Sequence, residues 1–215
     1  MKNFITFEGG EGTGKSTQSK LLFNSISKIT KKVVLTREPG GTKQSELLRD
    51  LIVKKKVSWD PLTEILLINA ARNEHIKKLI SPKLLEKNIV ICDRFIDSTY
   101  AYQIKAQKLN KKIFENLNKI VVRKVIPKIT FLIDIDPKIG IKRSLSRNNE
   151  EIKYENYKLD FHRNIRKAFL EISKFNRRVI LIDGNQEVEK IHKLIVDKIN
   201  TINLLKSKIP YSSYL

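Results

Sequence analysis

Residues 3–17 read NFITFEGGEGTGKST, where a short apolar run leads into a glycine-rich loop that ends in Lys15 and Ser16. The spacing G-x-x-x-x-G-K-S is that of a phosphate-binding P-loop, and it lies between a β-type run and a helical pattern, as the motif requires. Glycines let backbone N–H groups turn toward phosphate oxygens, and the N-terminus of the next helix adds partial positive charge. A chance glycine turn would not combine these features. The stretch therefore predicts binding of a nucleoside triphosphate.

The loop side chains have separate expected roles. Lys15 is expected to reach the β- and γ-phosphates, and Ser16 to offer its hydroxyl to Mg²⁺. The residues predicted to contact the triphosphate are Gly9, Gly10, Glu11, Gly12, Thr13, Gly14, Lys15, Ser16 and Thr17.

Length and composition favour one soluble domain. The 215 residues fit a single domain, residues 1–215, with a proper core. No apolar run reaches the length of about 18 residues that suggests a membrane span, and strand-like sequence starts at the N-terminus, so no signal peptide is expected. The only cysteine, Cys92, lies in an apolar run. We expect a buried thiol rather than a reactive one, and a reducing cytoplasm.

The chain is strongly basic, with a formal net charge of +20. Such a charge suggests nucleic acid as one partner. However, 32 of the 43 basic residues are Lys, and they are spread along the chain rather than interleaved with aromatic residues. The charge is therefore interpreted as a solvated surface, with no nucleic-acid partner; the alternative is a general attraction of phosphate ligands.

Strand-like runs alternate with amphipathic stretches of helix length, which predicts an α/β fold with a parallel sheet covered by helices on both faces. The five predicted strands are Phe4–Phe7, Val33–Thr36, Ile89–Cys92, Ile129–Asp134 and Val179–Ile182.

Asp60 and Pro61 mark a helix start, as N-cap and first helical residue. This helix is expected to run toward Leu79 and to be interrupted by Pro82. Two segments have weaker patterns: the polar stretch 148–156 is expected to pack poorly, and the tail 207–215 suggests no role.

Chemistry is expected at the carboxyl ends of the strands, where ligands bind in open α/β sheets. Asp93 follows four apolar residues and is predicted to hold Mg²⁺ directly or through water, the alternative being an N-cap for the next helix. Arg94 and Arg37 also follow strands and suit bidentate phosphate contacts, the alternative being ordinary surface arginines. Together these residues predict a phosphoryl-transfer site.

Four blocks of sequence resemble the bacterial thymidylate kinase family, in the family's order and spacing. They are residues 7–17, 36–42 (TREPGGT), 70–72 (AAR) and 93–103 (DRFIDSTYAYQ), and the resemblance extends to about Asn200. It implies a three-layer P-loop kinase fold with a five-stranded parallel sheet and a short lid. It also implies transfer of the γ-phosphoryl group of ATP to dTMP with Mg²⁺, in a cytoplasmic homodimer that works in dTTP synthesis.

The resemblance also assigns roles to side chains. Lys15, Arg94, Glu11, Asp93 and Arg147 match catalytic residues of the family, and Ser16 and Asp93 match the metal site. Glu11 matches an acidic residue that lies near the metal or the sugar 3′-OH. The matched substrate-binding residues are Arg37, Ile68, Arg72, Arg94, Ser98, Thr99, Tyr102 and Gln103. Of these, Arg72 matches the arginine that contacts the pyrimidine carbonyl, and Tyr102 the tyrosine that packs against the deoxyribose. The histidines His75, His162 and His192 fall in helical stretches and are predicted to be non-catalytic.

The chain departs from the family pattern in three places. The lid, about residues 143–155, keeps Arg143 and Arg147, of which Arg143 is expected to contact ATP, but has Lys153 where relatives carry an arginine. Ile68 replaces a phenylalanine that stacks on thymine in many relatives. Residues 104–108 replace a glycine-rich turn.

These departures leave a rival interpretation open: another small P-loop kinase acting on a different nucleoside monophosphate or on a deoxynucleoside. Such a kinase would explain the altered base pocket but not the 36–42 block. A catalytically weak ATP-binding regulator would be expected to lack Lys15, Asp93 or Arg94, and all three are present.

Overall fold

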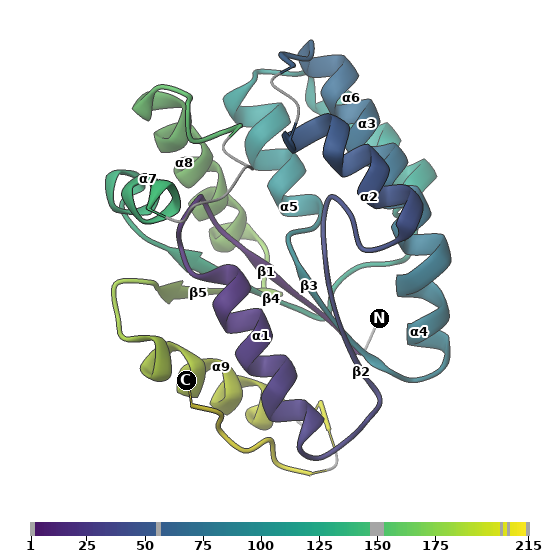
Figure 1. The fold of residues 1–215 in the computed structure, drawn as a ribbon, viewed down its shortest axis with the longest axis vertical. Coiled ribbons are helices and arrows are strands. Elements are labelled where there is room, and N and C mark those ends of the chain that lie inside the picture. The colour runs from purple at the N-terminus through teal and green to yellow at the C-terminus, as the bar shows by residue number, and fades with distance from the viewer. Residues whose placement is uncertain (1–2, 55–56, 147–152, 203, 206, 214–215) are drawn as a thin grey trace.

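Figure 1 shows the computed structural model, in which a central sheet lies between two layers of helices. The structure describes residues 3–54, 57–146, 153–202, 204–205 and 207–213. Within these residues the strands are β1 (Phe4–Glu8), β2 (Val33–Arg37), β3 (Ile89–Asp93), β4 (Ile129–Asp134) and β5 (Val179–Asp183). All neighbouring pairs are parallel, in the order β2-β3-β1-β4-β5. The predicted α/β class and all five predicted strands are confirmed.

Helices follow each strand. The α-helices are α1 (Lys15–Ser27), α2 (Lys43–Arg49), α3 (Pro61–His75), α4 (Ser81–Leu85), α5 (Ile96–Thr99), α6 (Lys111–Val121), α7 (Pro137–Leu145), α8 (Leu159–Phe175) and α9 (Val188–Thr201). Three π-helical segments are η1 (Asp50–Lys54), η2 (Ile76–Ile80) and η3 (Tyr100–Ala106). In the described part of the chain, no helix has the length and apolar character needed to cross a membrane.

The two faces of the sheet bury different helices, because successive strand residues point to opposite sides. On one face Ile5 and Phe7 pack with α1 and α9. On the other, Phe4 and Cys92 pack with η2 and the segment after α6. Leu132 packs on that same side with η3 and α8. Cys92 is a fully buried free thiol, as expected.

The strand register brings the functional strand ends together. Phe7 of β1 and Arg37 of β2 both lie opposite Asp93 of β3. Because parallel strands end at one edge, the P-loop after β1 faces the residues that follow β2 and β3.

The helical path that follows Asp60 is longer than predicted, because α3, η2 and α4 run on without a break to Leu85. The Asp60 side chain accepts a hydrogen bond from the Leu62 N–H, which confirms it as N-cap. Pro82, however, does not interrupt the helical path, so that expectation is wrong. The chain passes through the wider π turn η2, where the Ser81 N–H bonds to the Ile76 carbonyl five residues back, and Pro82 then lies in the first turn of α4. The wider turn accommodates a residue that has no N–H to offer.

The C-terminal tail packs across α1 and α9. Ile209 and Ser212 are buried, and the Asn200 side chain bonds to the backbone of Ile209 at both its N–H and its carbonyl. Ser212 bonds to Ser25 of α1 and, through its N–H, to His192 of α9. The tail therefore closes one edge of the core, a role the sequence did not suggest.

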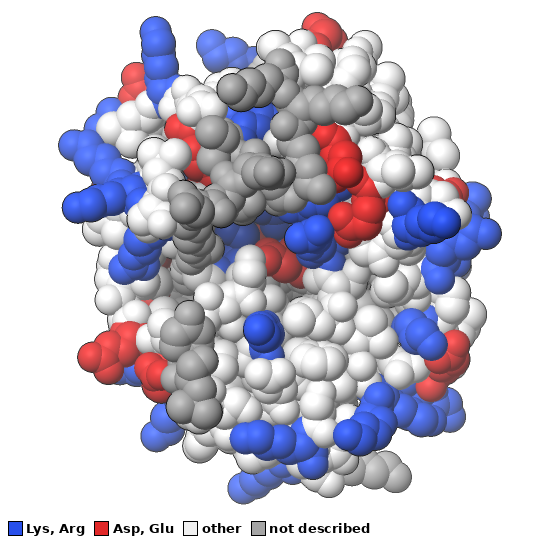
Figure 2. All heavy atoms as spheres, viewed as in Figure 1, with Lys and Arg blue, Asp and Glu red and all other residues white. Residues whose placement is uncertain are grey.

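Figure 2 shows that Lys and Arg are scattered over the face of the molecule seen in Figure 1 and do not gather along one element. This distribution fits the interpretation of the charge as a solvated surface.

Candidate active site

The P-loop joins β1 to α1 with its backbone in conformations that favour glycine. Gly9, Gly12 and Gly14 all have positive φ, and a Cβ on Gly12 would lie 2.0 Å from the Gly140 carbonyl oxygen of α7. Gly14 is the N-cap of α1 and gives no side-chain cap, so the first N–H groups of the helix remain available to an anion. This is the geometry of a phosphate cradle.

Lys15 lies inside this loop with only 6% of its surface exposed. Its Nζ donates to the Gly10 carbonyl at 2.5 Å and to Thr13 Oγ1 at 3.4 Å. Burial and, to a smaller extent, the nearby charge of Arg94 lower the pKa of Lys15 to about 8. The carboxylates of Glu11 and Asp93 act in the opposite direction. A phosphate placed here would raise the pKa of Lys15 again, because a nearby negative charge favours the ammonium form.

Ser16 and Asp93 provide oxygens that suit a magnesium ion. Ser16 Oγ donates to Asp93 Oδ2 at 2.5 Å, whereas Asp93 Oδ1 is buried without a hydrogen-bond partner in the described structure. A hydroxyl and a carboxylate beside a phosphate site fit Mg²⁺, which keeps several waters and takes few protein ligands. Consistent with this, the described residues contain no cluster of three or more His, Cys, Asp or Glu that would hold a metal by themselves.

Arg94 follows Asp93 in the left-handed region, with φ of 67°. Its guanidinium donates to the Gly9 carbonyl at 3.0 Å, to Ser98 Oγ at 3.1 Å and to Glu11 Oε2 at 2.9 Å. Although burial alone would act the other way, Glu11 raises the pKa of Arg94 well above its usual range. A non-glycine residue held at positive φ by this many contacts is typical of a functional site.

Glu11 links the P-loop to the helical segment η3. Its carboxylate accepts a hydrogen bond from Tyr102 Oη at 2.6 Å in addition to the ion pair with Arg94. Burial would raise the pKa of Glu11, but Arg94 and Lys15 outweigh it and the pKa is lowered. Glu11 is therefore anionic and keeps Tyr102 and Arg94 in fixed positions.

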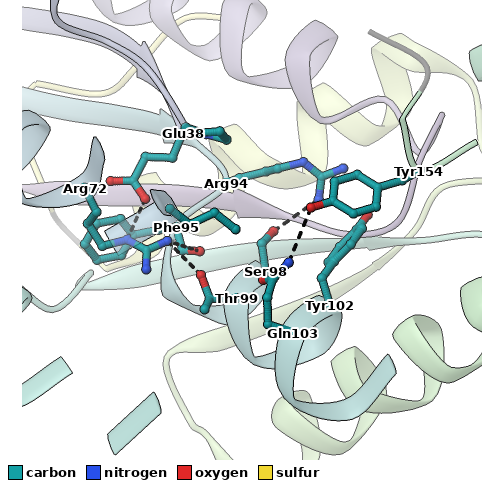
Figure 3. A pocket seen from close by; sticks show the side chains of 11 residues that line it. Glu38, Arg72, Arg94, Phe95, Ser98, Thr99, Tyr102, Gln103 and Tyr154 are labelled. Carbon is teal, nitrogen blue, oxygen red and sulfur yellow. Dashed lines mark hydrogen bonds and ion pairs between the residues drawn. The ribbon is translucent and has the colours of Figure 1, made fainter. Parts of the chain in front are cut away.

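A pocket that is open to solvent lies beside the P-loop (Figure 3). Its walls come from the end of β2, from α3 and from the α5–η3 helix. They include the predicted substrate residues Ile68, Arg72, Arg94, Ser98, Thr99, Tyr102 and Gln103. Arg37 does not line it, and instead points to α2, where it pairs with Glu46 at 3.1 Å.

Arg72 is the most constrained side chain of this pocket. It is 2% exposed and donates to Glu38 Oε2 at 2.7 Å, to Thr99 Oγ1 at 2.9 Å and to the Phe95 carbonyl at 3.2 Å. Its remaining group, Nη1, is buried and has no protein partner in the described residues. A buried donor without a partner on a pocket wall is suited to a ligand acceptor.

Glu38 holds Arg72 in place and was not predicted from the sequence. His75 Nδ1 lies 3.0 Å from Glu38 Oε1, and its other nitrogen lies 2.7 Å from Thr36 Oγ1. Burial opposes ionisation, but Arg72 and His75 lower the pKa of Glu38. His75 thus supports Glu38 from the side away from the pocket. The sequence signal for Glu38 was its position in the 36–42 block, directly after a predicted strand.

Three further wall and support residues were missed. Glu8 accepts hydrogen bonds from the Phe95 and Ser98 N–H groups and from Ser98 Oγ, at 2.5 Å for the hydroxyl. Burial, with the nearby Asp97 carboxylate, raises the pKa of Glu8 to about 7. Glu64 and Tyr154 meet at the far side of the pocket, where Tyr154 Oη donates to Glu64 Oε1 at 2.7 Å.

The predicted lid falls partly outside the described residues. Arg143 of α7 donates to the Gly184 carbonyl after β5 at 3.3 Å. Arg147 and residues 148–152 lie outside the described part of the chain. Residues 153–156 are described, and there the expected poor packing is wrong, because Tyr154 packs against the cluster around Tyr102 and the Lys153 side chain pairs with Glu64.

The chain matches known proteins over most of its length. The family model "Thymidylate kinase" matches residues 7–195. Thymidylate kinase of Wolbachia pipientis wMel is 45% identical over 201 residues, covering 91% of this chain and 99% of that protein. The thymidylate kinase of Aster yellows witches'-broom phytoplasma is 42% identical over 205 residues, covering 93% of this chain and 97% of that protein.

The fold is also similar to that of a solved thymidylate kinase structure. The crystal structure of thymidylate kinase from Ehrlichia chaffeensis superposes with a TM-score of 0.75 at 40% identity, covering 92% of this chain and 97% of that one. The family model and the solved structure therefore agree, and this chain belongs to the thymidylate kinase family.

Proposed function

We propose that this protein transfers the γ-phosphoryl group of ATP to dTMP, giving dTDP and ADP, as a step in dTTP synthesis. The observation that carries the proposal is the single pocket that has buried Arg72 at one end and Arg94, beside the P-loop, at the other (Figure 3).

The base end of the pocket suits a pyrimidine with a carbonyl at position 4. The free Nη1 of Arg72 is a donor for that carbonyl oxygen. Gln103 directs its Nε2 to Glu64 at 2.8 Å, which leaves its carbonyl oxygen for the ring N3–H of thymine or uracil. Cytosine presents the opposite pattern at both positions.

The middle of the pocket favours a deoxyribose. Tyr102 is 3% exposed, and its hydroxyl is fixed by Glu11. A ring held this rigidly leaves little freedom to accommodate a 2′-OH.

The phosphate end supports charge stabilisation in place of general-base catalysis. The acceptor is a phosphate oxygen that is already anionic, so the site must align two polyanions and stabilise the spreading charge. Arg94, fixed by Glu11, Gly9 and Ser98, is aimed between the P-loop and the acceptor pocket. Ser16, and Asp93 directly or through water, would hold Mg²⁺, which when bound neutralises phosphate charge. Lys15 and the α1 N-terminus bind the triphosphate.

Residues on the donor side complete the proposal. Arg143, next to Gly184, is proposed to contact ATP, and Arg147 is proposed as the lid arginine that reaches the transferring group. Residues 143–155 would act as the lid of a single domain, residues 1–215.

We also propose a cytoplasmic homodimer. An amphipathic helix with an unburied apolar side supports the dimer, because Ile120 of α6 is 65% exposed. The buried free thiol of Cys92 suits a reducing compartment.

A coupled ADP-release assay with ATP, Mg²⁺ and a panel of nucleoside monophosphates tests the proposal. We expect dTMP to give the highest kcat/KM and dUMP the next. A higher kcat/KM for AMP, GMP or CMP would contradict it and favour the rival kinase, which the similarity of the whole chain to thymidylate kinases does not support.

A further inference from the structure

A carboxylate lies behind the base end of the pocket, outside the residues assigned above to substrate. Glu64, in the first turn of α3, is 1% exposed and does not line the pocket. It lies one and two helical turns before Ile68 and Arg72, on the same side of α3, since residues four apart share a helix face. A fully buried carboxylate must serve its partners, because burial of an unpaired charge is unfavourable.

Glu64 is surrounded by donors from two separate parts of the chain. Its Oε1 accepts from Gln103 at 2.8 Å, from Gln107 at 2.9 Å and from Tyr154 Oη at 2.7 Å. Its Oε2 forms an ion pair with Lys153. Lys153 thus places a positive charge beside this carboxylate inside the protein.

The two amide hydrogens of Gln103 both point to protein acceptors. One amide hydrogen goes to Glu64, and Nε2 also lies 3.3 Å from Tyr154 Oη, which already donates its own proton to Glu64 and is therefore an acceptor. Both amide hydrogens are then used on the protein side. A rotated amide would bring its carbonyl oxygen against the Glu64 carboxylate, which is repulsive.

We infer that Glu64 is a specificity-determining positioning residue, which fixes the Gln103 amide so that only its carbonyl oxygen faces the base. This inference rests on the proposed function. It makes the pocket an acceptor for a pyrimidine N3–H and excludes a cytosine ring, whose N3 is itself an acceptor. Glu64 acts through Gln103 and contacts no substrate atom.

The test compares dTMP with dCMP as acceptors for the purified full chain and for Glu64→Gln. A neutral amide at position 64 accepts or donates, so Gln103 is free to rotate. We expect the ratio of kcat/KM for dTMP over dCMP to fall by about tenfold or more, the effect of one hydrogen bond in a buried site. The KM for ATP should not change, since Glu64 lies away from the P-loop.

Gln107→Leu is the matched control. It removes another donor to the same carboxylate but does not line the pocket, so the dTMP over dCMP ratio should stay at the wild-type value. In a Gln103→Leu background, Glu64→Gln should have no further effect on the ratio. An unchanged ratio in Glu64→Gln, an equal loss in Gln107→Leu, or an additive effect without Gln103 would each overturn the inference.

A second variant keeps the test decisive if Glu64→Gln does not fold. Glu64→Gln combined with Lys153→Met removes both charges of the buried pair, which avoids an uncompensated ammonium. We expect this double variant to show the same fall in the ratio of kcat/KM for dTMP over dCMP. A wild-type enzyme that does not use dTMP would contradict the proposed function itself, whereas a wild-type preference for dTMP with an unchanged ratio in the variants contradicts only the role of Glu64.

Discussion

Arg94 Nη2 lies 2.9 Å from Glu11 Oε2, and this ion pair joins the residue after β3 to the P-loop after β1. The two strands are neighbours in the sheet, so the pair is a direct result of the strand order. Glu11 also binds Tyr102, which means that the phosphate end and the sugar end of the pocket share one carboxylate. A change at any of these three residues is expected to reach the other two.

Removal of either buried cation should slow the chemical step. Lys15→Ala and Arg94→Ala each delete charge that is needed most in the transition state, so we expect kcat to fall by about 10²-fold or more. Lys20→Ala, on the exposed side of α1, serves as the control and should leave kcat unchanged. Losses of tenfold or less at both Lys15 and Arg94 would remove them from this role.

Lys15 should make the ligand-free protein less stable at neutral pH. Its pKa falls from 10.5 to about 8 on folding, so below pH 8 the folded state carries a charge that burial disfavours. Lys15→Met is therefore expected to raise the Tm at pH 7 by several degrees. The difference should shrink between pH 8 and 10.5, where wild-type Lys15 is neutral when folded. A gain that is constant over this range in thermal melts would show that Lys15 is not the group responsible.

The tail should loosen in acid because it is held by a neutral histidine. Ser212 N–H donates to His192 Nε2 at 3.2 Å, and burial lowers the pKa of His192 to about 4 from 6.5. The unfolded chain takes up this proton between pH 6.5 and 4 and the folded one does not, so stability falls as the pH drops through that window. His192→Asn should show a smaller loss of Tm between pH 7 and 4. An equal loss in the variant would assign the acid sensitivity to other groups.

The fold was predictable because its signals are local. Five apolar runs, the glycine loop and the Asp60–Pro61 helix start are each read within a few residues, and all were found as predicted. Pro82 failed because a π turn adjusts the backbone before it, which no local pattern revealed. The distinction is between features set by neighbours in sequence and features set by the rest of the molecule.

The buried carboxylates of the site illustrate the second kind. Glu8, Glu38 and Glu64 look like surface residues by composition, since glutamate is rarely buried. Each is buried because residues from another element supply its partners: Ser98 for Glu8, Arg72 for Glu38, and Gln103 for Glu64. Only the folded topology brings these pairs together.

The lid arginine should affect catalysis more than acceptor binding. Arg147→Ala is expected to reduce kcat by a larger factor than it raises the KM for dTMP, because a lid residue acts when the site closes over both substrates. Residues 153–155 at the end of the lid, where Lys153 and Tyr154 contact Glu64, should show slower amide exchange with a two-substrate mimic bound. Unchanged exchange there, or equal effects on kcat and KM, would contradict the lid assignment.

Ile68 tests whether the base pocket has room for an aromatic wall. It is 8% exposed, lines the pocket one turn before Arg72, and has no ring that could stack on a base. Such stacking is worth about 0.5–1.5 kcal/mol beyond area, so Ile68→Phe should lower the KM for dTMP about threefold to tenfold. kcat should change little, because stacking stabilises ground and transition states equally. Ile68→Leu, which adds no ring, should keep the wild-type KM. A lower Tm without tighter dTMP binding would instead indicate overpacking, which costs about 1–3 kcal/mol, and would assign Ile68 to the core of α3.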